Sequence, residues 1–245
     1  MSEAGAHPAD GRADAVAAGL ATVERRIADA CARAGRDRDE VTLVVVTKYF
    51  PVSDVRLLAD LGVREVGENR YQEAVAKSEE CADLDLRWHF MGRLQSNKAA
   101  ATGRWADVVQ SLDRAKLVTP LARGAEEREG RGPLDVLVQV NLDTDPEEAQ
   151  GRGGADPADV PALAEAVVAA ASLRLRGVMA VAPREGDPRA AFERLRAVSE
   201  TVRAVVPEAT YVSAGMSGDL EVALECGATH VRVGGAILGN RPTNG

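Results

Sequence analysis

Residues 41–51 read VTLVVVTKYFP, and this stretch decides the fold that the sequence predicts. Its apolar residues are mostly β-branched and run without alternation, a pattern typical of a parallel strand buried on both faces. Lys48, one of only four lysines, follows this run, and Pro51 prevents the strand from continuing. Functional groups of α/β enzymes stand at such strand ends. The alternative is a lysine whose stem packs and whose ammonium reaches water.

Apolar runs and helical patterns alternate along the rest of the chain. Expected strands begin near residues 42, 63, 87, 106, 134, 173, 209 and 229. Amphipathic helical patterns separate them at residues 52–61, 71–81, 96–101, 114–129, 158–171, 189–205 and 217–225. Because parallel strands need crossover connections, eight such units predict an α/β fold, a single (β/α)8 TIM barrel. The alternative is an open doubly wound sheet.

The N-terminal segment precedes this repeat. Residues 1–12 mix Gly, Pro, Asp and Ala without periodicity, which predicts a flexible tail. Residues 14–35 carry apolar residues at helical spacing, which predicts an extra helix before the first strand. No linker divides residues 13–245, so we expect one barrel domain whose last helix is a short stub.

Composition argues against several classes of function. The net charge of −8 disfavours a nucleic-acid partner, and no apolar run is long enough to span a membrane. Three scattered cysteines fit a reducing cytoplasm, and three scattered histidines offer no metal site. The acidic residues 143–148 lack the full calcium-loop pattern. We expect residues 143–157 to form a mobile loop after the fifth strand.

A closed barrel brings the ends of the seventh, eighth and first strands together. Ser213 and Ser217 follow the seventh strand, while Arg232 ends the eighth and precedes Gly234 and Gly235. Loops after strands seven and eight of this fold commonly bind phosphate, because glycine N–H groups and a helix N-terminus favour anions. Each feature alone has a structural alternative: an N-cap for Ser217, a paired structural arginine, and an ordinary Gly-Gly turn.

A lysine facing a phosphate cradle predicts a Schiff base with an aldehyde that carries a phosphate. Lysine becomes a nucleophile of this kind when it is desolvated or lies beside another cation, and Arg232 supplies the cation. Pyridoxal 5′-phosphate fits this description. Its aldehyde would meet Lys48, its phosphate would meet the loops after the seventh and eighth strands, and Arg232 would lie near the pyridine ring.

Seven motifs follow one another along the chain. They are VVVTKYFP around Lys48, GENRYQEA at 67–74, WHFMGRLQSNK at 88–98, SLDR at 111–114, LRGVMAV at 175–181, SAGMSGDLEVAL at 213–224 and THVRVGGAILGNR at 229–241. With these motifs the chain resembles the pyridoxal phosphate homeostasis proteins, which look like the barrel domain of bacterial alanine racemase standing alone. The resemblance covers nearly the whole chain, from about residue 20 to residue 242.

The resemblance implies roles for particular residues. It implies that Lys48 holds pyridoxal phosphate covalently and that Arg232 faces the pyridine nitrogen. It also implies that Ser213 and the backbone at Gly234 and Gly235 hold the phosphate. Ser217, in the same loop as Ser213, is a further candidate phosphate ligand.

The resemblance also implies a role for Asn69, and the sequence differs from the family pattern in two places. Asn69, at the end of the second expected strand, would line the ring side of the site. Gly235 stands where the family commonly has a small hydroxyl residue, which removes one side-chain donor. Residues 151–153 replace a lysine-containing loop, so the role of that lysine is absent or taken by Arg152.

The expected function is cofactor handling with little or no catalysis. An arginine opposite the pyridine nitrogen disfavours a protonated ring, and a neutral ring is a weaker electron sink. Racemisation also needs a second acid–base group, which a second domain supplies in the resembling racemases and which this chain is not expected to contain. We therefore expect a cytoplasmic monomer or weak dimer that holds pyridoxal phosphate and passes it to the apo forms of enzymes that use it.

Two other functions use the same residue types. An amino-acid racemase would need Tyr49 or His89 as its second base, although packing explains both residues. A Schiff-base aldolase would use the same lysine and phosphate cradle on a sugar phosphate, without a coloured cofactor. Colour and borohydride reduction distinguish the aldolase from the cofactor-binding protein.

Overall fold

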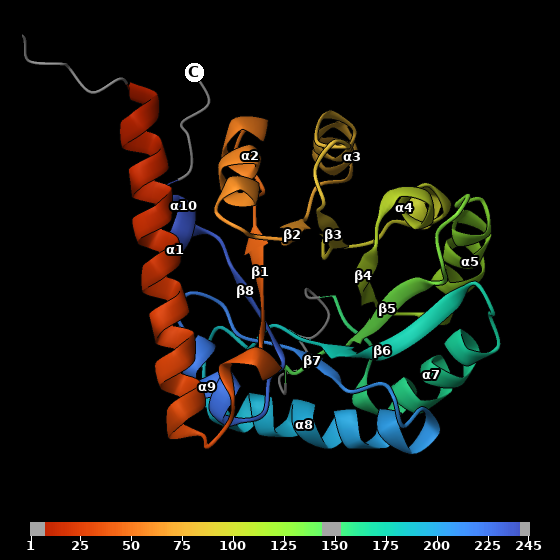
Figure 1. Cartoon of the computed structure of the whole chain (residues 1–245). Coiled ribbons are helices and arrows are strands. Elements are labelled where there is room, and N and C mark those ends of the chain that lie inside the picture. Colours follow the sequence, from red (N-terminus) through yellow and green to blue (C-terminus); the bar gives the residue numbers. More distant parts are fainter. Residues whose placement is uncertain (1–7, 144–152, 241–245) are drawn as a thin grey trace, which may run out of the picture.

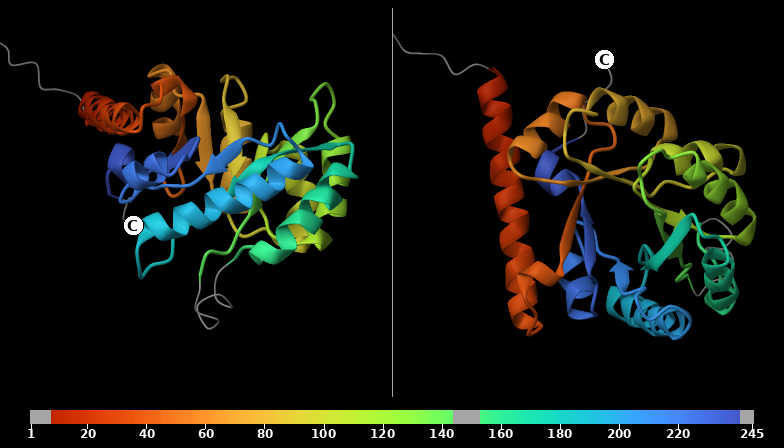
Figure 2. Two further views of the ribbon diagram at one scale, coloured as in Figure 1. Left: turned by 90° about the horizontal axis from the view of Figure 1, so that it is seen from below. Right: turned by 45° about the vertical axis from the view of Figure 1, so that its right-hand side comes forward.

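The structure is a computed structural model, and it describes residues 8–143 and 153–240. Eight parallel strands form a closed barrel in which each strand pairs with the next and β8 pairs with β1. Helices lie around the outside of the barrel, as the views in Figures 1 and 2 show. The predicted (β/α)8 barrel is therefore confirmed, and the open doubly wound sheet is excluded.

The strands lie close to their expected positions. The expected starts near residues 63, 106 and 209 each fall two residues before the observed strand. The strands are β1 (Thr42–Val46), β2 (Glu65–Glu68), β3 (Arg87–Phe90), β4 (Val108–Leu112), β5 (Leu134–Gln139), β6 (Leu173–Met179), β7 (Tyr211–Ser213) and β8 (His230–Val233).

Each crossover helix falls within or next to an expected helical segment. The helices are α2 (Val52–Asp60), α3 (Tyr71–Glu80), α4 (Ala99–Trp105), α5 (Val118–Glu126), α7 (Val160–Val168), α8 (Pro188–Val205), α9 (Leu220–Glu225) and α10 (Gly235–Leu238). Short 3₁₀ turns are η1 (Arg38–Glu40), η2 (Ser96–Lys98), η3 (Ala115–Leu117) and η4 (Pro157–Asp159). The predicted stub after the last strand is α10.

The strands are buried because helices cover their outer face and side chains fill the interior. Every residue of β4 and β8 is buried, and Val44 and Val45 of β1 are completely buried. Leu58 of α2 and Leu195 of α8 are completely buried in the main hydrophobic core. Each such side chain contributes about 1.5–3 kcal/mol through removal of its apolar surface from water.

The extra N-terminal helix is α1 (Pro8–Arg33). It begins at Pro8, so residues 8–12 of the expected tail are helical, and residues 1–7 lie outside the described part of the chain. α1 packs against α9 and α10 (Figure 1). Arg12 Nη1 donates to Leu238 O at 3.0 Å, and Arg26 Nη2 donates to Ser217 O at 2.9 Å. The helix therefore braces the segments that follow both β7 and β8.

The sequence also predicted a mobile loop after the fifth strand. Most of the expected loop at residues 143–157, including nearly all of the acidic stretch, lies outside the described residues, while Ala155 forms a bridge with Val140.

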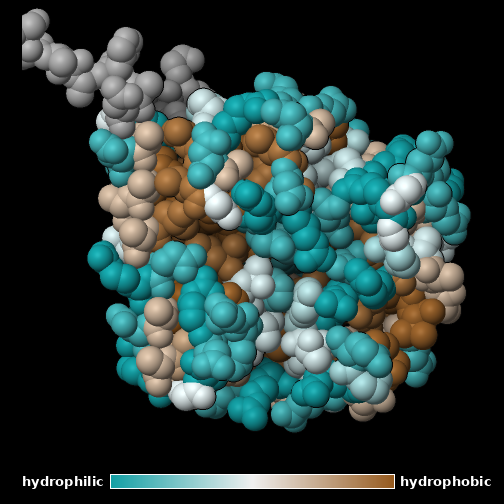
Figure 3. All heavy atoms as spheres, viewed as in Figure 1, coloured by the Kyte–Doolittle hydropathy of each residue, from teal (hydrophilic) through white to brown (hydrophobic). Residues whose placement is uncertain are grey.

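On the face drawn in Figure 3, hydrophobic residues gather between α1 and α2, and much of the rest is hydrophilic. None of the helices described is both long enough and apolar enough for a membrane crossing.

Candidate functional site

A cavity of about 400 Å³ opens at the carboxyl ends of the strands. Its polar lining comes from the segments that follow β1, β2, β7 and β8, together with Arg232 of β8 itself. Such a volume lies within the range of small-molecule sites. The lining residues are Val46, Lys48, Phe50, Asn69, Met91, Met179, Val181, Met216, Ser217, Arg232, Gly234, Gly235, Gly239 and Asn240.

Ring closure is what brings the predicted residues together. β1 and β8 pair in register, with Val44 opposite Arg232 and Val45 opposite Val233. Lys48 follows the first of these strands and Gly234 follows the second, so both line the cavity although they are far apart in sequence. Of the seven residues predicted for the site, all but Ser213 line this cavity.

Lys48 sits in a tight turn directly after β1. The turn is closed by Phe50 N, which donates to Thr47 O at 3.0 Å. Tyr49, next to the lysine, has a φ of 72°, in the left-handed region that a non-glycine residue enters at a cost of roughly 1–2 kcal/mol. Its N–H donates to Glu73 Oε1 at 2.6 Å, which stabilises this conformation. The lysine is therefore presented by a strained turn that neighbouring side chains hold.

Arg232 is the cation of the cavity. Its guanidinium is buried, donating from Nη1 to Ser213 Oγ and from Nη2 to Ala180 O, both at 2.7 Å. Burial lowers the pKa of Arg232 to about 10, so the side chain stays positive at neutral pH. Within the described part of the chain no carboxylate lies within ion-pairing distance of it. A buried unpaired cation favours a ligand that is anionic or offers a hydrogen-bond acceptor.

Ser213 occupies a different place from the one expected. It is completely buried below the cavity, donates to Gln110 Oε1 at 2.7 Å and accepts from Arg232. Its hydroxyl is therefore engaged as both donor and acceptor within the barrel. In this structure Ser213 orients the arginine, while Ser217, four residues later, lines the cavity.

The segments after β7 and β8 form the opposite wall. Ser217 precedes α9, which begins at Leu220 with Asp219 as its N-cap, so Ser217 is not the N-cap residue. A Cβ on Gly234 would lie 2.8 Å from Val46 O, and this close approach requires glycine. A Cβ on Gly235 would meet nothing within 4 Å. The wall therefore presents a hydroxyl and exposed backbone with room for a bulky anionic group.

Asn69 carries an observation that favours a ligand. It follows β2 and lines the cavity beside Lys48. Its Oδ1 is buried and has no hydrogen-bond partner among the described residues. Because burying an amide oxygen without a partner costs free energy, this atom points to a group that the site is built to receive.

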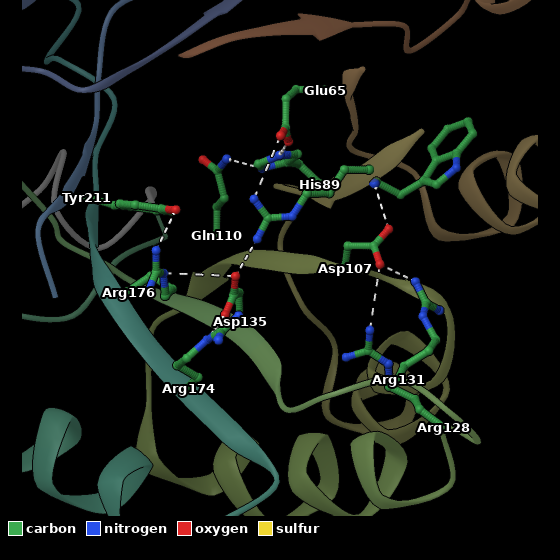
Figure 4. A network of polar contacts seen from close by, with 12 residues as sticks. Glu65, His89, Asp107, Gln110, Arg128, Arg131, Asp135, Arg174, Arg176 and Tyr211 are labelled. Carbon is green, nitrogen blue, oxygen red and sulfur yellow. Dashed lines mark hydrogen bonds and ion pairs between the residues drawn. The ribbon is translucent and has the colours of Figure 1, made fainter. Parts of the chain in front are cut away.

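Sequence reasoning missed the polar column beneath the cavity. Ser213 leads through Gln110 to His89, whose Nδ1 lies 2.7 Å from Gln110 Nε2, and on to Glu65, which lies 2.5 Å from His89 Nε2. Figure 4 shows Gln110, His89 and Glu65 in this order. The available signal was a glutamine inside VVQSL, the otherwise largely apolar β4. The column links Arg232 to the amino ends of the strands.

Buried charges also gather at those amino ends (Figure 4). The Asp135 carboxylate is 2 % exposed, pairs with Arg87 and accepts from Arg174 Nε at 2.5 Å. This cluster lies at the end of the barrel opposite the cavity. At that end of this fold, residues commonly serve stability. None of its members lines the cavity.

The two candidate racemase bases do not line the cavity. His89 is 1 % exposed inside the barrel, and both ring nitrogens have partners in the column. Tyr49 is 40 % exposed, with the Arg70 guanidinium over its ring at 5.7 Å. The cavity lining within the described part of the chain includes no carboxylate and no imidazole.

The chain is similar to known proteins along most of its length. Residues 20–242 match the family model described as alanine racemase, N-terminal domain. The pyridoxal phosphate homeostasis protein of Mycobacterium tuberculosis is 44% identical over 240 residues, with 91% of each chain covered. That of Escherichia coli is 36% identical over 234 residues, covering 92% of this chain and 97% of the relative. The chain therefore belongs to the alanine racemase N-terminal domain family and, within it, to the pyridoxal phosphate homeostasis proteins.

Solved structures agree with this assignment. PipY of Synechococcus elongatus, in a structure described as having PLP bound, is 34% identical with a TM-score of 0.77, covering 91% of this chain and 100% of PipY. Alanine racemase from Corynebacterium glutamicum has a TM-score of 0.67 at 16% identity, covering 95% of this chain and 62% of the racemase. The second likeness shows the fold alone.

Proposed function

We propose that this protein binds pyridoxal 5′-phosphate, holds it covalently on Lys48 and thereby serves cofactor homeostasis. The observation that carries the proposal is a single cavity lined by Lys48 after β1 and by Ser217, Gly234 and Gly235 after β7 and β8. Family membership and the cofactor named for PipY support it. The bound cofactor supplies an aldehyde that reacts with amines.

Each residue of the cavity has a distinct task in this proposal. Lys48 would hold the cofactor through condensation of its amine with the aldehyde, which releases water, and the strained turn at Tyr49 would aim that amine. The Ser217 hydroxyl and the backbone at Gly234 and Gly235 hold the phosphate, which has free space where Gly235 lacks a side chain. In the proposal, Ser213 orients the arginine in place of its expected phosphate contact.

Two buried polar groups meet the ring in this proposal. Arg232, fixed by Ser213 and Ala180, faces the pyridine nitrogen and keeps it unprotonated, because a guanidinium donates and does not accept. Asn69 Oδ1, which has no partner among the described residues, meets the ring side of the cofactor. Among the described residues, Arg232 has hydrogen-bond acceptors but no carboxylate in ion-pairing distance, and Asn69 Oδ1 has no hydrogen-bond partner.

We further propose that the protein has little or no catalytic activity. An unprotonated ring is a weak electron sink, and proton abstraction needs an acid–base group facing the substrate. The described cavity lining offers no carboxylate or imidazole, and His89 is engaged in the column. A racemase and a sugar-phosphate aldolase remain the competing functions that the experiment below excludes.

The setting of this function is also part of the proposal. Cys31, Cys81 and Cys226 are buried and unpaired, which supports a reducing compartment such as the cytoplasm. The proposed recipients of the cofactor are apo enzymes that depend on it. The proposed oligomeric state is a monomer or weak dimer.

Reduction of the purified protein with borohydride tests the attachment. We expect a yellow protein that bleaches on reduction and gains the mass of one reduced cofactor, with the label on Lys48 by peptide mapping. Lys77, Lys98 and Lys116 serve as internal controls and should remain unlabelled. A protein that stays colourless with excess pyridoxal phosphate contradicts the proposal, and turnover of alanine at ordinary enzyme rates contradicts the non-catalytic part.

A further inference from the structure

A buried lysine outside the cavity is tied to the turn that carries Lys48. Lys77 lies on α3 and is 6 % exposed. Its Nζ donates to Thr47 O at 2.7 Å, to Glu68 Oε1 at 2.7 Å and to Glu73 Oε1 at 2.6 Å. These three acceptors use all three N–H bonds of the ammonium group.

The two carboxylates that meet Lys77 also contact the residues on either side of Lys48. Glu68 Oε1 accepts from the Thr47 hydroxyl at 2.7 Å. Glu73 Oε1 accepts from Tyr49 N at 2.6 Å, and Tyr49 is the residue with φ of 72°. The residues before and after Lys48 are therefore both bound to one buried charge cluster, made of Lys77, Glu68 and Glu73.

Such a cluster is a costly way to stabilise a fold. Glu68 is completely buried, and burial raises the pKa of its carboxyl, against the opposing effect of Lys77. Glu68 Oε2 has no partner among the described residues. Buried ion pairs often stabilise no better than apolar side chains of similar size, and in some proteins their value lies in fixing one conformation. Here that conformation is the turn at residues 47–50.

We propose that Lys77 is a positioning residue which, through Thr47 and Glu73, holds the turn that aims Lys48 into the cavity. This inference rests on the proposed function and deepens it. Without Lys77 the Thr47 carbonyl keeps only the Phe50 N–H as a donor, and Glu73 loses the charge that fixes it against Tyr49 N. The left-handed conformation at Tyr49 is then disfavoured, and Lys48 samples orientations away from the cavity.

Amide hydrogen exchange measured by NMR before any cofactor is added tests the bracing directly. In Lys77→Met we expect the Tyr49 and Phe50 amides to exchange about tenfold faster, as loss of charge-assisted hydrogen bonds predicts. Glu73→Met, on a side chain that is 21 % exposed, should have the same effect if Lys77→Met does not fold. Glu73→Gln keeps an oxygen acceptor for Tyr49 N and should restore most of the protection.

Loss of cofactor to a scavenging apo enzyme provides the second measurement. We expect release from Lys77→Met and Glu73→Met to be about tenfold faster than from the wild type, with Glu73→Gln in between. Asp135→Asn is the matched control, because it disrupts a buried charge cluster at the opposite end of the barrel. It should change neither the exchange of residues 47–50 nor the release rate.

The outcomes separate this inference from the proposed function. If the two variants behave like the wild type, or if Asp135→Asn has an equal effect, Lys77 is merely structural and the inference is overturned. If wild-type protein takes up no cofactor at Lys48, the proposed function fails. The exchange measurements still decide in that case whether Lys77 braces the turn.

Discussion

Ser213 Oγ accepts a hydrogen bond from Arg232 Nη1 at 2.7 Å, and both side chains are buried beneath the cavity. The serine also donates to Gln110, so its hydroxyl fixes the arginine to the polar column inside the barrel. The resemblance assigned this serine to the phosphate. In the structure its hydroxyl contacts the arginine and Gln110 and does not line the cavity, so the predicted phosphate role can be tested.

Ser213→Ala and Ser217→Ala should separate the two roles. Ser213→Ala leaves a buried Arg232 donor and Gln110 without their partner, so we expect the free energy of unfolding to fall by about 1–3 kcal/mol. Ser217→Ala, on the half-buried wall of the cavity, should change stability by about 0.5 kcal/mol or less but weaken cofactor binding about tenfold. Urea denaturation and equilibrium titration with pyridoxal phosphate check both. Equal losses of affinity with unchanged stability would return Ser213 to the phosphate site.

Lys48→Ala should abolish covalent attachment without unfolding the barrel. A half-buried side chain in a loop contributes little to the core, so we expect a change in unfolding free energy of about 1 kcal/mol or less. Borohydride treatment followed by intact mass should show no added cofactor. Weak non-covalent binding through Ser217 and the glycine backbone should persist. A variant that unfolds would identify Lys48 as a structural residue.

The two adjacent glycines should respond differently to substitution. Gly235→Ser adds a side chain into open space and returns a hydroxyl donor, so we expect tighter cofactor binding, by about fivefold, with unchanged stability. Gly234→Ala puts a Cβ 2.8 Å from Val46 O, which forces β1 and β8 apart. We expect it to cost about 1–3 kcal/mol of stability. Thermal denaturation and cofactor titration of both variants check this, and a harmless Gly234→Ala would contradict the close approach.

Stability should fall in acid partly because of His230. Burial, followed by electrostatic interaction with His89, Arg87, Arg176 and Arg232, lowers the pKa of His230 to about 3 from its ordinary 6.5. A lowered folded-state pKa gives stability that is complete above pH 6.5 and lost as the pH falls from there towards 3. At pH 5 this group alone should make the protein about 2 kcal/mol less stable than at pH 7.

His230→Phe isolates that contribution. The ring packs against Tyr211 with centroids 4.2 Å apart, and phenylalanine keeps this contact while removing the titration. Urea denaturation at several pH values should give a shallower acid slope for the variant than for the wild type. Parallel slopes would mean that the pKa of His230 is the same in the folded and unfolded states, and would contradict this prediction.

Much of the fold followed from local patterns. Unbroken apolar runs indicated buried parallel strands, and helical spacing between them indicated crossovers, because both signals depend only on neighbouring residues. Boundaries moved by a few residues, as at β2, where the apolar Val63 precedes the strand, and at α9, where the polar residues 217–219 precede the helix. α1 began before its expected start because Pro is well tolerated in the first turn of a helix.

The candidate site was predicted less completely than the fold. Strand ends are readable, so Lys48, Asn69, Ser217 and the two glycines reached the cavity as expected. The sequence does not reveal which side chain turns inward below a strand end, and Ser213, which was predicted to meet the phosphate, does not line the cavity. Lys77 gave only one local signal, its i,i+4 spacing from Glu73 on α3, because its other two acceptors, at Thr47 and Glu68, come from other segments.

The sequence by itself determined the eight repeated units, the lysine after the first strand and the serine- and glycine-containing segments after the last two, since each is encoded within a few consecutive residues. Only the tertiary structure decided that Val44 lies opposite Arg232, that Ser213 orients Arg232 and that Lys77 holds the turn around Lys48. The physical reason is that register and side-chain direction depend on packing between segments distant in the chain, and closure of the barrel sets them all together.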